Sequence, residues 1–225
     1  MAEAVARRLE DSTTAPIART PLVCAGTAFV VDGWEYSTGA QSGPVVVADR
    51  SALAKVHVRA PATAEVISTL GTRFGRAAWI GDRLVIGSGP DDWLVFGAPG
   101  QAHAIAVGVE TMLEAAGPGP ITVMDLTHGR ALMRVSGAQT MSLLRRVTAV
   151  DLDDRLVPNG SALRTSLAAV VTDLIRDDQG GQASFLLHCE RSSGRYVQQA
   201  LLAAGADLGA VAGASSPAWP DDAMD

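Results

Sequence analysis

Two similar stretches of sequence, at 45–117 and 121–205, constrain the fold of this chain more than any other feature. A Gly-Pro-Gly-Pro sequence at 117–120 favours a turn between them. Each stretch opens with an apolar run that ends in an aspartate, and a hydroxyl residue follows two positions later. These four residues are Asp49, Ser51, Asp125 and Thr127. Because the same pattern starts both stretches, we predict two similar units rather than one undivided domain.

The elements expected after each opening run also match in kind and order. An alternating strand comes first, then a helix, a hairpin and an amphipathic closing helix. In the first stretch they lie at 55–59, 61–71, 83–96 and 102–117. In the second, the strand lies at 131–135, and the helix begins at Ser136, with Gln139 completing a capping box. The hairpin strands lie at 167–176 and 183–188, and the closing helix lies at 197–205. The order predicts an α+β fold of two pseudo-repeated strand–helix halves, each a mostly antiparallel sheet covered by helices.

The two ends of the chain are expected to lie outside these halves. Residues 1–44 are predicted as an N-terminal arm and lead-in, and residues 206–225, rich in small and polar residues, as a flexible tail. Trp219 is the only aromatic residue of this tail. An isolated tryptophan of this kind is either an anchor that docks on a partner or an incidental tail residue.

Composition and charge exclude several classes of partner. The formal net charge is −6, whereas nucleic acid or an anionic membrane surface selects a basic face. No run of ~18 apolar residues predicts a membrane span. The start of the chain has no apolar block typical of a secretory signal, and Cys24 and Cys189 are too few for a disulfide scaffold. We therefore expect a cytoplasmic protein that binds neither nucleic acid nor membranes.

The histidines and cysteines have no spacing typical of a metal site. His57 alternates with two valines and is expected to face solvent. His188 and Cys189 are neighbours in a strand and should point to opposite faces. The remaining histidines are His103 and His128. We therefore predict that the chain holds no metal ion.

No phosphate loop or nucleophile motif predicts catalysis. The glycines at 87–92 lead into a strand at Trp93, and not into the helix N-terminus that would hold a phosphate. The loop at 97–100 precedes a helix but has no Lys-Ser/Thr signature, and no Gly-x-Ser-x-Gly occurs. The neighbouring aspartates lie in turns, where aspartate favours local hydrogen bonds over acid–base work. They are Asp91 and Asp92, and Asp151, Asp153 and Asp154.

The cluster Asp125-Leu-Thr-His128-Gly-Arg130 has two interpretations. Aspartate, threonine and histidine within four residues are able to build a hydrogen-bonded polar site at a strand end. The preferred interpretation is a tight loop, in which Asp125 and Thr127 hydrogen-bond the backbone and Gly129 permits the turn. The residues alone therefore identify no catalytic residue, and they leave any cofactor-binding residues unknown.

The same cluster carries a family resemblance. The segment from Asp125 through Arg130 to Gly137 resembles the Asp-[Val/Leu]-[Ser/Thr]-[His/Asp]-Gly-Arg … Ser-Gly segment of the gamma subunit of heterotetrameric sarcosine oxidase. That subunit belongs to the glycine-cleavage T-protein-like fold family. Gly89-Pro-Asp-Asp-Trp-Leu resembles the hairpin of the gamma subunit, and the segment from Thr165, through Phe185-Leu-Leu to Arg191-Ser192, resembles its ending. The similarity spans about 49–205.

The resemblance implies a non-catalytic gamma subunit that stabilises a four-subunit flavoenzyme by packing on its alpha subunit. Such a complex oxidatively demethylates sarcosine or a similar N-methyl amine. Its larger flavin- and folate-binding subunits, the expected partners, hold FAD, FMN, NAD and tetrahydrofolate, and no cofactor is expected on this chain. Neither the catalytic aspartate nor the folate-holding carboxylate of a T-protein is placed on any residue here, so no catalytic assignment is carried over.

Two alternatives stay open. One is a stand-alone tetrahydrofolate-binding or aminomethyltransferase-like protein, which the shared fold would allow. The other is a relative of the same fold that scaffolds a different amine-oxidising or demethylating complex, which only its partners would distinguish from a gamma subunit.

Overall fold

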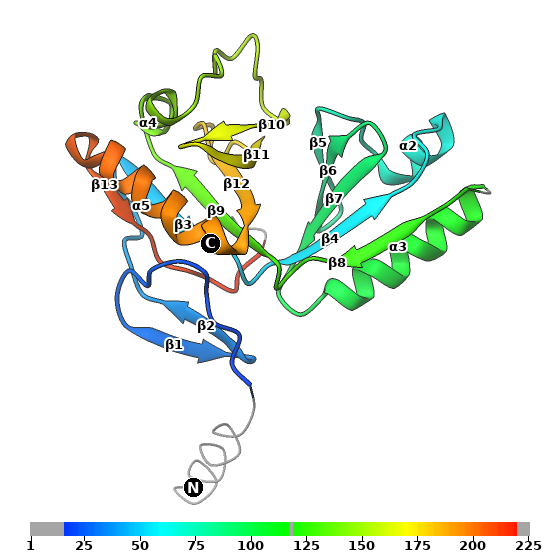
Figure 1. Ribbon diagram of the computed structural model, residues 1–225, viewed down its shortest axis with the longest axis horizontal. Helices are drawn as coiled ribbons and strands as arrows, with labels where there is room; N and C mark the ends of the chain where they lie inside the picture. Colours follow the sequence, from blue (N-terminus) through cyan, green and yellow to red (C-terminus); the bar gives the residue numbers. More distant parts are fainter. Residues whose placement is uncertain (1–15, 118, 220–225) are drawn as a thin grey trace, which may run out of the picture.

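Two mostly antiparallel sheets face each other in the computed structural model of the chain, which describes residues 16–117 and 119–219 (Figure 1). The order of the five-stranded sheet is β5-β6-β7-β4-β8, and that of the six-stranded sheet is β10-β11-β12-β9-β3-β13. The predicted α+β class is confirmed. The first sheet comprises β4 (Ala54–Arg59), β5 (Ala77–Ile80), β6 (Arg83–Gly89), β7 (Asp92–Gly97) and β8 (Thr122–Asp125). The second comprises β3 (Val45–Asp49), β9 (Arg130–Ser136), β10 (Ala162–Leu167), β11 (Val170–Arg176), β12 (Phe185–Glu190) and β13 (Ala210–Ala212).

Each sheet takes one strand from the other half of the sequence. β3 pairs with β9 in the six-stranded sheet, although β4 is the strand that follows β3 in the chain. Conversely, β8 pairs with β4 in the five-stranded sheet, although β9 follows β8. The stretches at 45–117 and 121–205 therefore divide the sequence but not the sheets, because the opening strand of each stretch lies in the sheet of the other.

The repeated aspartate and hydroxyl residues form the turns at which the chain crosses between the sheets. Asp49 Oδ1 accepts a hydrogen bond from the backbone N–H of Ser51 at 2.8 Å, and Asp125 Oδ1 accepts one from Thr127 at 2.7 Å. Each hydroxyl then accepts a backbone N–H from a strand of the other half, at 3.1 Å in both cases. The sequence repeat is therefore the structural device that fixes the strand exchange.

Helices cover the outer faces of both sheets. α2 (Ala64–Leu70) and α3 (Ala102–Ala116) lie on the five-stranded sheet, and α4 (Thr140–Val147) and α5 (Gly194–Ala204) lie on the six-stranded sheet (Figure 1). No helix of the described residues combines the length and apolar character needed to cross a membrane. The arrangement in order is helices, sheet, sheet, helices.

Apolar side chains from both sheets fill the space between them. Because successive side chains of a strand point to opposite faces, the residues that neighbour these inward-facing side chains point outward and pack under the helices. Adjacent residues of one strand thus belong to different cores. In β7, Val95 packs under α3, whereas Leu94 packs between the sheets. The inter-sheet core includes Leu84, Ile86, Leu94 and Phe96 from one sheet, and Leu132, Ala162, Ile175 and Leu186 from the other.

Two predicted elements of the second half are wrong in detail. Ser136 is the last residue of β9, and α4 begins at Thr140 after Gln139, whose side chain makes no capping bond. The predicted capping box is therefore absent, because β9 extends to pair with β3. The predicted strand at 167–176 is instead the turn and second strand of a β10–β11 hairpin. The chain reverses at Ala168 and Ala169, whose φ angles are 47° and 66°.

The described parts of both chain ends are ordered against the sheets. A hairpin of β1 (Ala28–Val31) and β2 (Trp34–Ser37) forms within the predicted N-terminal arm. The flexible tail predicted at 206–225 is corrected for residues 206–219, because β13 adds a parallel strand to β3. Trp219 then packs on Trp79, with ring centroids 4.8 Å apart. Residues 1–15 and 220–225, also predicted as arm and tail, lie outside the described residues.

Candidate functional site

Strand alternation brings polar residues from both sheets to one end of the inter-sheet core. His57 and Arg59 of β4 share the inner face, because Val56 and Val58 point to the helices. On the opposite sheet, His188 of β12 faces inward, whereas Cys189 packs in the core under the helices. The two neighbours therefore point to opposite faces of the sheet, as their alternation in a strand predicted. The two sheets therefore present polar side chains to each other.

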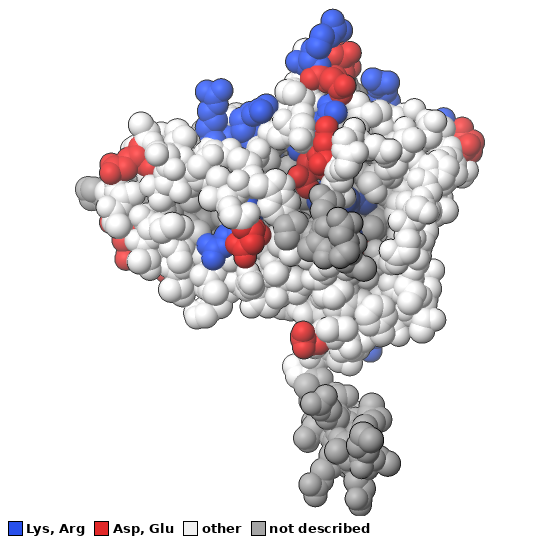
Figure 2. Space-filling view, turned by 180° about the vertical axis from the view of Figure 1, so that it is seen from behind, with Lys and Arg blue, Asp and Glu red and all other residues white. Residues whose placement is uncertain are grey.

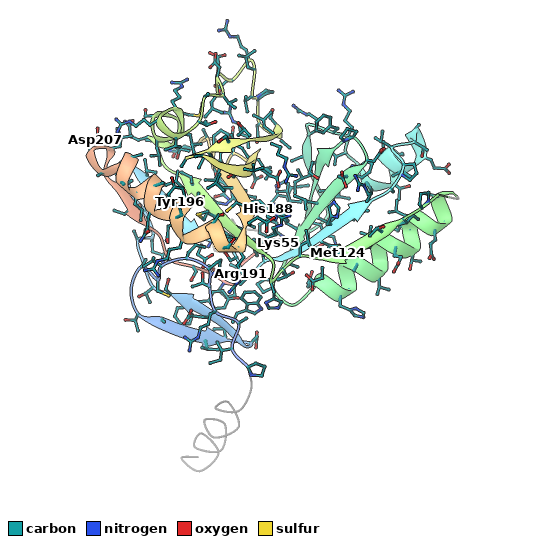
Figure 3. The ribbon with its side chains drawn as sticks, viewed as in Figure 1. Lys55, Met124, His188, Arg191, Tyr196 and Asp207 are labelled. Atoms are coloured by element: carbon teal, nitrogen blue, oxygen red, sulfur yellow. The ribbon has the colours of Figure 1, made fainter. Side chains whose placement is uncertain are left out.

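A cleft of about 580 Å³ opens among these side chains, a size typical of small-molecule sites. Figure 3 shows the labelled His188 and Lys55 near the middle of the molecule, with Met124 on the side of the five-stranded sheet. Leu94, Met124 and Leu126 supply apolar wall. The charged and imidazole groups of the lining are His57, Arg59, Asp92, Arg130, Arg164, Asp173 and His188. These residues define the site called the cleft below.

His188 and Asp173 form a buried pair in the cleft. His188 is 2% exposed, and its Nδ1 lies 2.8 Å from Asp173 Oδ2. Because a carboxylate only accepts hydrogen bonds, Nδ1 carries the proton. Burial lowers the pKa of His188, while the neighbouring Asp173 opposes that shift. The imidazole is therefore neutral near pH 7, and its buried Nε2 is an acceptor that has no hydrogen-bond partner among the described residues.

A second histidine–aspartate pair lies on the opposite wall of the cleft, in the five-stranded sheet. His57 Nε2 lies 3.0 Å from Asp92 Oδ1, and Arg59 donates to Asp92 Oδ2 at 3.4 Å. The expectation that His57 faces solvent is wrong, because its side chain is only 27% exposed and lines the cleft. Asp92, which the sequence placed in a turn, begins β7 and contacts both His57 and Arg59.

Arginines outnumber aspartates in the cleft. Arg59, Arg130 and Arg164 line it together with two aspartates, so the arginines and aspartates of the lining carry an excess of positive charge. Arg130 is paired with Glu190. Arg164 is 56% exposed, and its Nη1 comes no closer to Asp173 than 3.9 Å. A guanidinium in this state is available to bind an anion, because fork-shaped donors fit carboxylates well.

Lys55 is a buried amine that sequence reasoning missed. It is 0% exposed, and Nζ donates to the carbonyls of Ser51 at 2.7 Å and Leu53 at 2.8 Å. Burial lowers the pKa of Lys55 to about 7, although Asp49 and Asp125 oppose the shift. Two carbonyl acceptors match the two N–H donors of a neutral amine. Lys55 does not line the cleft, so its role is in the junction between the sheets.

The cluster at 125–130 is a loop, as the preferred interpretation had it. Asp125 and Thr127 bond the backbone. His128 stacks on Trp34 with ring centroids 4.7 Å apart, and Arg130 alone of the cluster's polar residues lines the cleft. Gly129 has no positive φ, so the turn does not depend on a glycine there. The cluster therefore supplies one arginine to the cleft and no assembled polar site.

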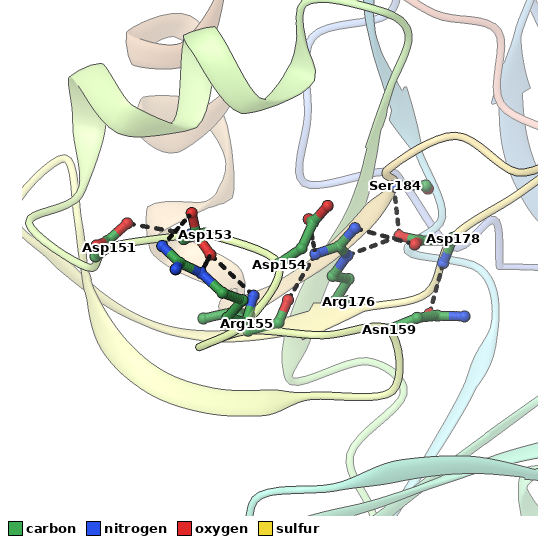
Figure 4. Close-up of polar contacts among 9 residues, drawn as sticks. Asp151, Asp153, Asp154, Arg155, Asn159, Arg176, Asp178 and Ser184 are labelled. Atoms are coloured by element: carbon green, nitrogen blue, oxygen red, sulfur yellow. Dashed lines mark hydrogen bonds and ion pairs between the residues drawn. The ribbon is translucent and has the colours of Figure 1, made fainter.

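The aspartates at 151–154 lie in the loop between α4 and β10 and bond within it or to β11 (Figure 4). Asp151 accepts from the backbone of Asp153 at 3.1 Å, and Asp153 accepts from the backbone of Arg155 at 3.0 Å. Asp154 instead pairs with Arg176 at 2.6 Å, which ties the loop to β11. None of the three lines the cleft. They serve as turn and tether residues, which matches the local role expected for turn aspartates.

The glycine-rich segments also have structural roles. The segment at 87–92 forms the end of β6 and the turn into β7. A Cβ at Gly87 would lie 2.1 Å from the carbonyl oxygen of Arg73, so a glycine is needed where these backbones approach. The loop at 97–100 leads from β7 to α3, which begins at Ala102 without a side-chain cap. His103 lies on the first turn of α3, away from the cleft.

The remaining candidate groups do not assemble into a metal centre. In the described parts of the chain, no three residues of the His, Cys, Asp and Glu types lie together as metal ligands. Burial raises the pKa of the Cys189 thiol to about 11 and, more weakly, raises that of Cys24. A nucleophilic cysteine has a lowered pKa, so neither thiol has that character.

Comparison with known proteins relates the chain to two structures by fold. No family model and no curated protein matches it in sequence. A chain of heterotetrameric sarcosine oxidase from Corynebacterium sp. U-96, solved with pyrrole 2-carboxylate, is similar with a TM-score of 0.62 and 22% identity, over 74% of this chain and 87% of that chain. The glycine cleavage system aminomethyltransferase T from Bartonella henselae is similar with a TM-score of 0.61 and 15% identity, over 85% of this chain. The fold is T-protein-like.

This chain spans only 56% of the length of that aminomethyltransferase T. At these identities the likeness is one of fold. Sequence reasoning missed the cleft residues Arg164, Asp173 and His188 as a group, because they come from three strands of one sheet. The only signal was alternation within each strand, which shows that they share a face but not what that face meets.

Proposed function

We propose that this chain is a non-catalytic subunit of an oxidoreductase complex of the sarcosine oxidase type. Such a complex would oxidatively demethylate sarcosine or a similar N-methyl amine. The observation that carries the proposal is the fold similarity to a chain of a heterotetrameric sarcosine oxidase, which covers most of both chains. The larger partner subunits would hold FAD, FMN, NAD and tetrahydrofolate, and the complex would be cytoplasmic.

The β1–β2 hairpin supports a subunit role. Phe29 and Val30 are neighbours in β1, so they point to opposite faces of the hairpin, yet they are 40% and 49% exposed. Neither face of β1 is therefore fully covered by this chain. A two-stranded hairpin with apolar side chains on both faces gains stability when a partner buries them.

The surface seen from behind is consistent with such a partner. Figure 2 shows that charged side chains are sparse over this face and gather mainly towards one end. Permanent subunit interfaces are large and depleted of charge in their centre. A mainly uncharged face of this kind is what a subunit of a stable complex would present.

Copurification tests the subunit proposal. The tagged chain is expressed in its native cell and captured, and the eluate is analysed for larger proteins and for flavin absorbance. We expect stoichiometric larger subunits and a flavin spectrum. The double variant Phe29→Asp/Val30→Asp should lose them, whereas Val171→Asp, at a position 60% exposed in β11, should keep them. A chain that is stable and captures no flavoprotein contradicts the proposal.

A stand-alone folate-binding or aminomethyltransferase-like protein is the second candidate, which the T-protein-like fold favours. Titration of tetrahydrofolate into the purified chain separates the two. Heat or a fluorescence change at about 100 μM, which is in the range of ordinary enzyme KM values, would support this candidate. The absence of both at that concentration would favour the subunit role.

A further inference from the structure

We propose that the cleft binds a small organic carboxylate that also presents an N–H or O–H donor to His188. This inference goes beyond the subunit role and does not depend on it, because it rests only on side chains of this chain. It concerns binding and assigns no reaction to the cleft.

The first observation is the unpartnered acceptor of His188. Its Nδ1 is committed to Asp173 at 2.8 Å, which leaves Nε2 as the acceptor of the neutral ring. Nε2 is buried and has no hydrogen-bond partner in the described parts of the chain. A buried polar atom without a partner is costly, and such atoms are rare in folded proteins. A ligand with an N–H or O–H group at this point would remove that cost.

The second observation is the positive charge in the lining of the same cleft. Arg164 and His188 flank the same carboxylate, since Arg164 Nη1 lies 3.9 Å from Asp173 Oδ1 and His188 binds Oδ2. Asp173 thus links the guanidinium of Arg164 and the imidazole of His188 within the lining of the cleft. Arg130 and Arg59 add positive charge to the same lining. A carboxylate is the ligand group that such planar donors bind best.

The third observation is the apolar part of the lining. Phe74, Leu94 and Leu126 line the cleft beside the charged groups. Phe74 is 58% exposed, so a ligand would cover apolar surface that now faces solvent. A volume of about 580 Å³ accommodates a carboxylate with an apolar body. The cleft therefore combines an anion site, an acceptor and an apolar wall.

Three probes of one shape test this combination. 4-Hydroxybenzoate has the carboxylate and the donor, benzoate lacks the donor, and 4-hydroxybenzamide lacks the charge. Each is titrated into the full chain while the side-chain ¹⁵N resonances of His188 are followed. We expect 4-hydroxybenzoate to bind with a Kd of about 1 mM and to shift the Nε2 resonance, and the other two to bind about tenfold more weakly.

Two arginine variants locate the binding. Arg164→Gln should weaken the binding of 4-hydroxybenzoate about tenfold, because it removes a positive charge from the lining of the cleft. Arg155→Gln is the matched control, since Arg155 is an exposed arginine of a distant loop, and it should bind as the parent does. The proposal is overturned by equal binding of the three probes, by equal loss in both variants, or by an unmoved Nε2 resonance at saturation.

Discussion

The backbone N–H of Lys55 donates a hydrogen bond to the hydroxyl of Thr127 at 3.1 Å, across the two halves of the sequence. Thr127 is 4% exposed, so this bond is shielded from water. Thr127→Val removes the acceptor at nearly constant volume and leaves a buried N–H unpaired. We expect the free energy of unfolding to fall by about 2 kcal/mol in urea titrations. Thr127→Ser keeps the hydroxyl and should lose much less, and equal losses in the two variants would refute the role of the bond.

The crossing turns show which part of the fold was predictable from sequence. The aspartate and hydroxyl pairs at Asp49 and Asp125 are local patterns, so their repetition was readable, and the order of elements followed from it. The exchange of β3 and β8 was not readable. An apolar run predicts a buried strand but does not identify the strand that pairs with it, since pairing depends on contacts far apart in the chain.

Lys55 should make the stability of the chain depend on pH. Its pKa is about 7 in the folded state and about 10.4 when unfolded, so between these values only the unfolded chain carries the extra proton. The free energy of unfolding should therefore rise with pH above 7, by about 1.4 kcal/mol per pH unit at most, and the gain is lost as pH falls towards 7. Urea titrations between pH 7 and about 7.5 measure the rise before the unfolded thiols, with a pKa of about 8.5, lose much of their protons.

The matched variant for this prediction is Lys55→Met. It keeps the length of the side chain and removes the titrating group, so the rise that Lys55 causes should be absent across the same pH range. The carbonyls of Ser51 and Leu53 lose their donor, which lowers stability at every pH without adding a slope. A parent slope that persists in Lys55→Met would assign the pH dependence to other groups.

Asp177 joins the two sheets through two donors. Trp79 of β5 donates from Nε1 to Asp177 Oδ1 at 2.9 Å, and Arg134 of β9 donates to Oδ2 at 2.6 Å. Arg134 is 2% exposed. Asp177→Asn removes the carboxylate that this buried guanidinium binds, and should cost about 3 kcal/mol in the free energy of unfolding. Trp79→Phe removes one hydrogen bond from an uncharged donor and part of the ring that packs on Trp219, and should cost about 2 kcal/mol, so a larger loss for Trp79→Phe than for Asp177→Asn would contradict this assignment.

The cleft shows why the candidate site was not predictable. Arg164, Asp173 and His188 are distributed over β10, β11 and β12, and no local pattern joins them. Each lies in an ordinary strand sequence, where a single histidine has no diagnostic spacing. The pairing register brings His188 opposite Asp173, and only the packing of two sheets shows that this pair faces a cleft.

The β10–β11 turn was unreadable for a different reason, and it gives the last prediction. Two-residue hairpin turns with positive φ usually contain asparagine and glycine, whereas this turn has Ala168 and Ala169 at 47° and 66°. The left-handed conformation costs about 1 kcal/mol for a residue with a Cβ. Ala169 is exposed, so Ala169→Gly should relieve the strain without opening a cavity. Because glycine also adds about 0.5 kcal/mol of freedom to the unfolded chain, the free energy of unfolding should rise by about 0.5 kcal/mol. Ala200→Gly within α5 is the control and should lower it by about 1 kcal/mol, and a loss of stability in Ala169→Gly as well would show that the turn is not strained.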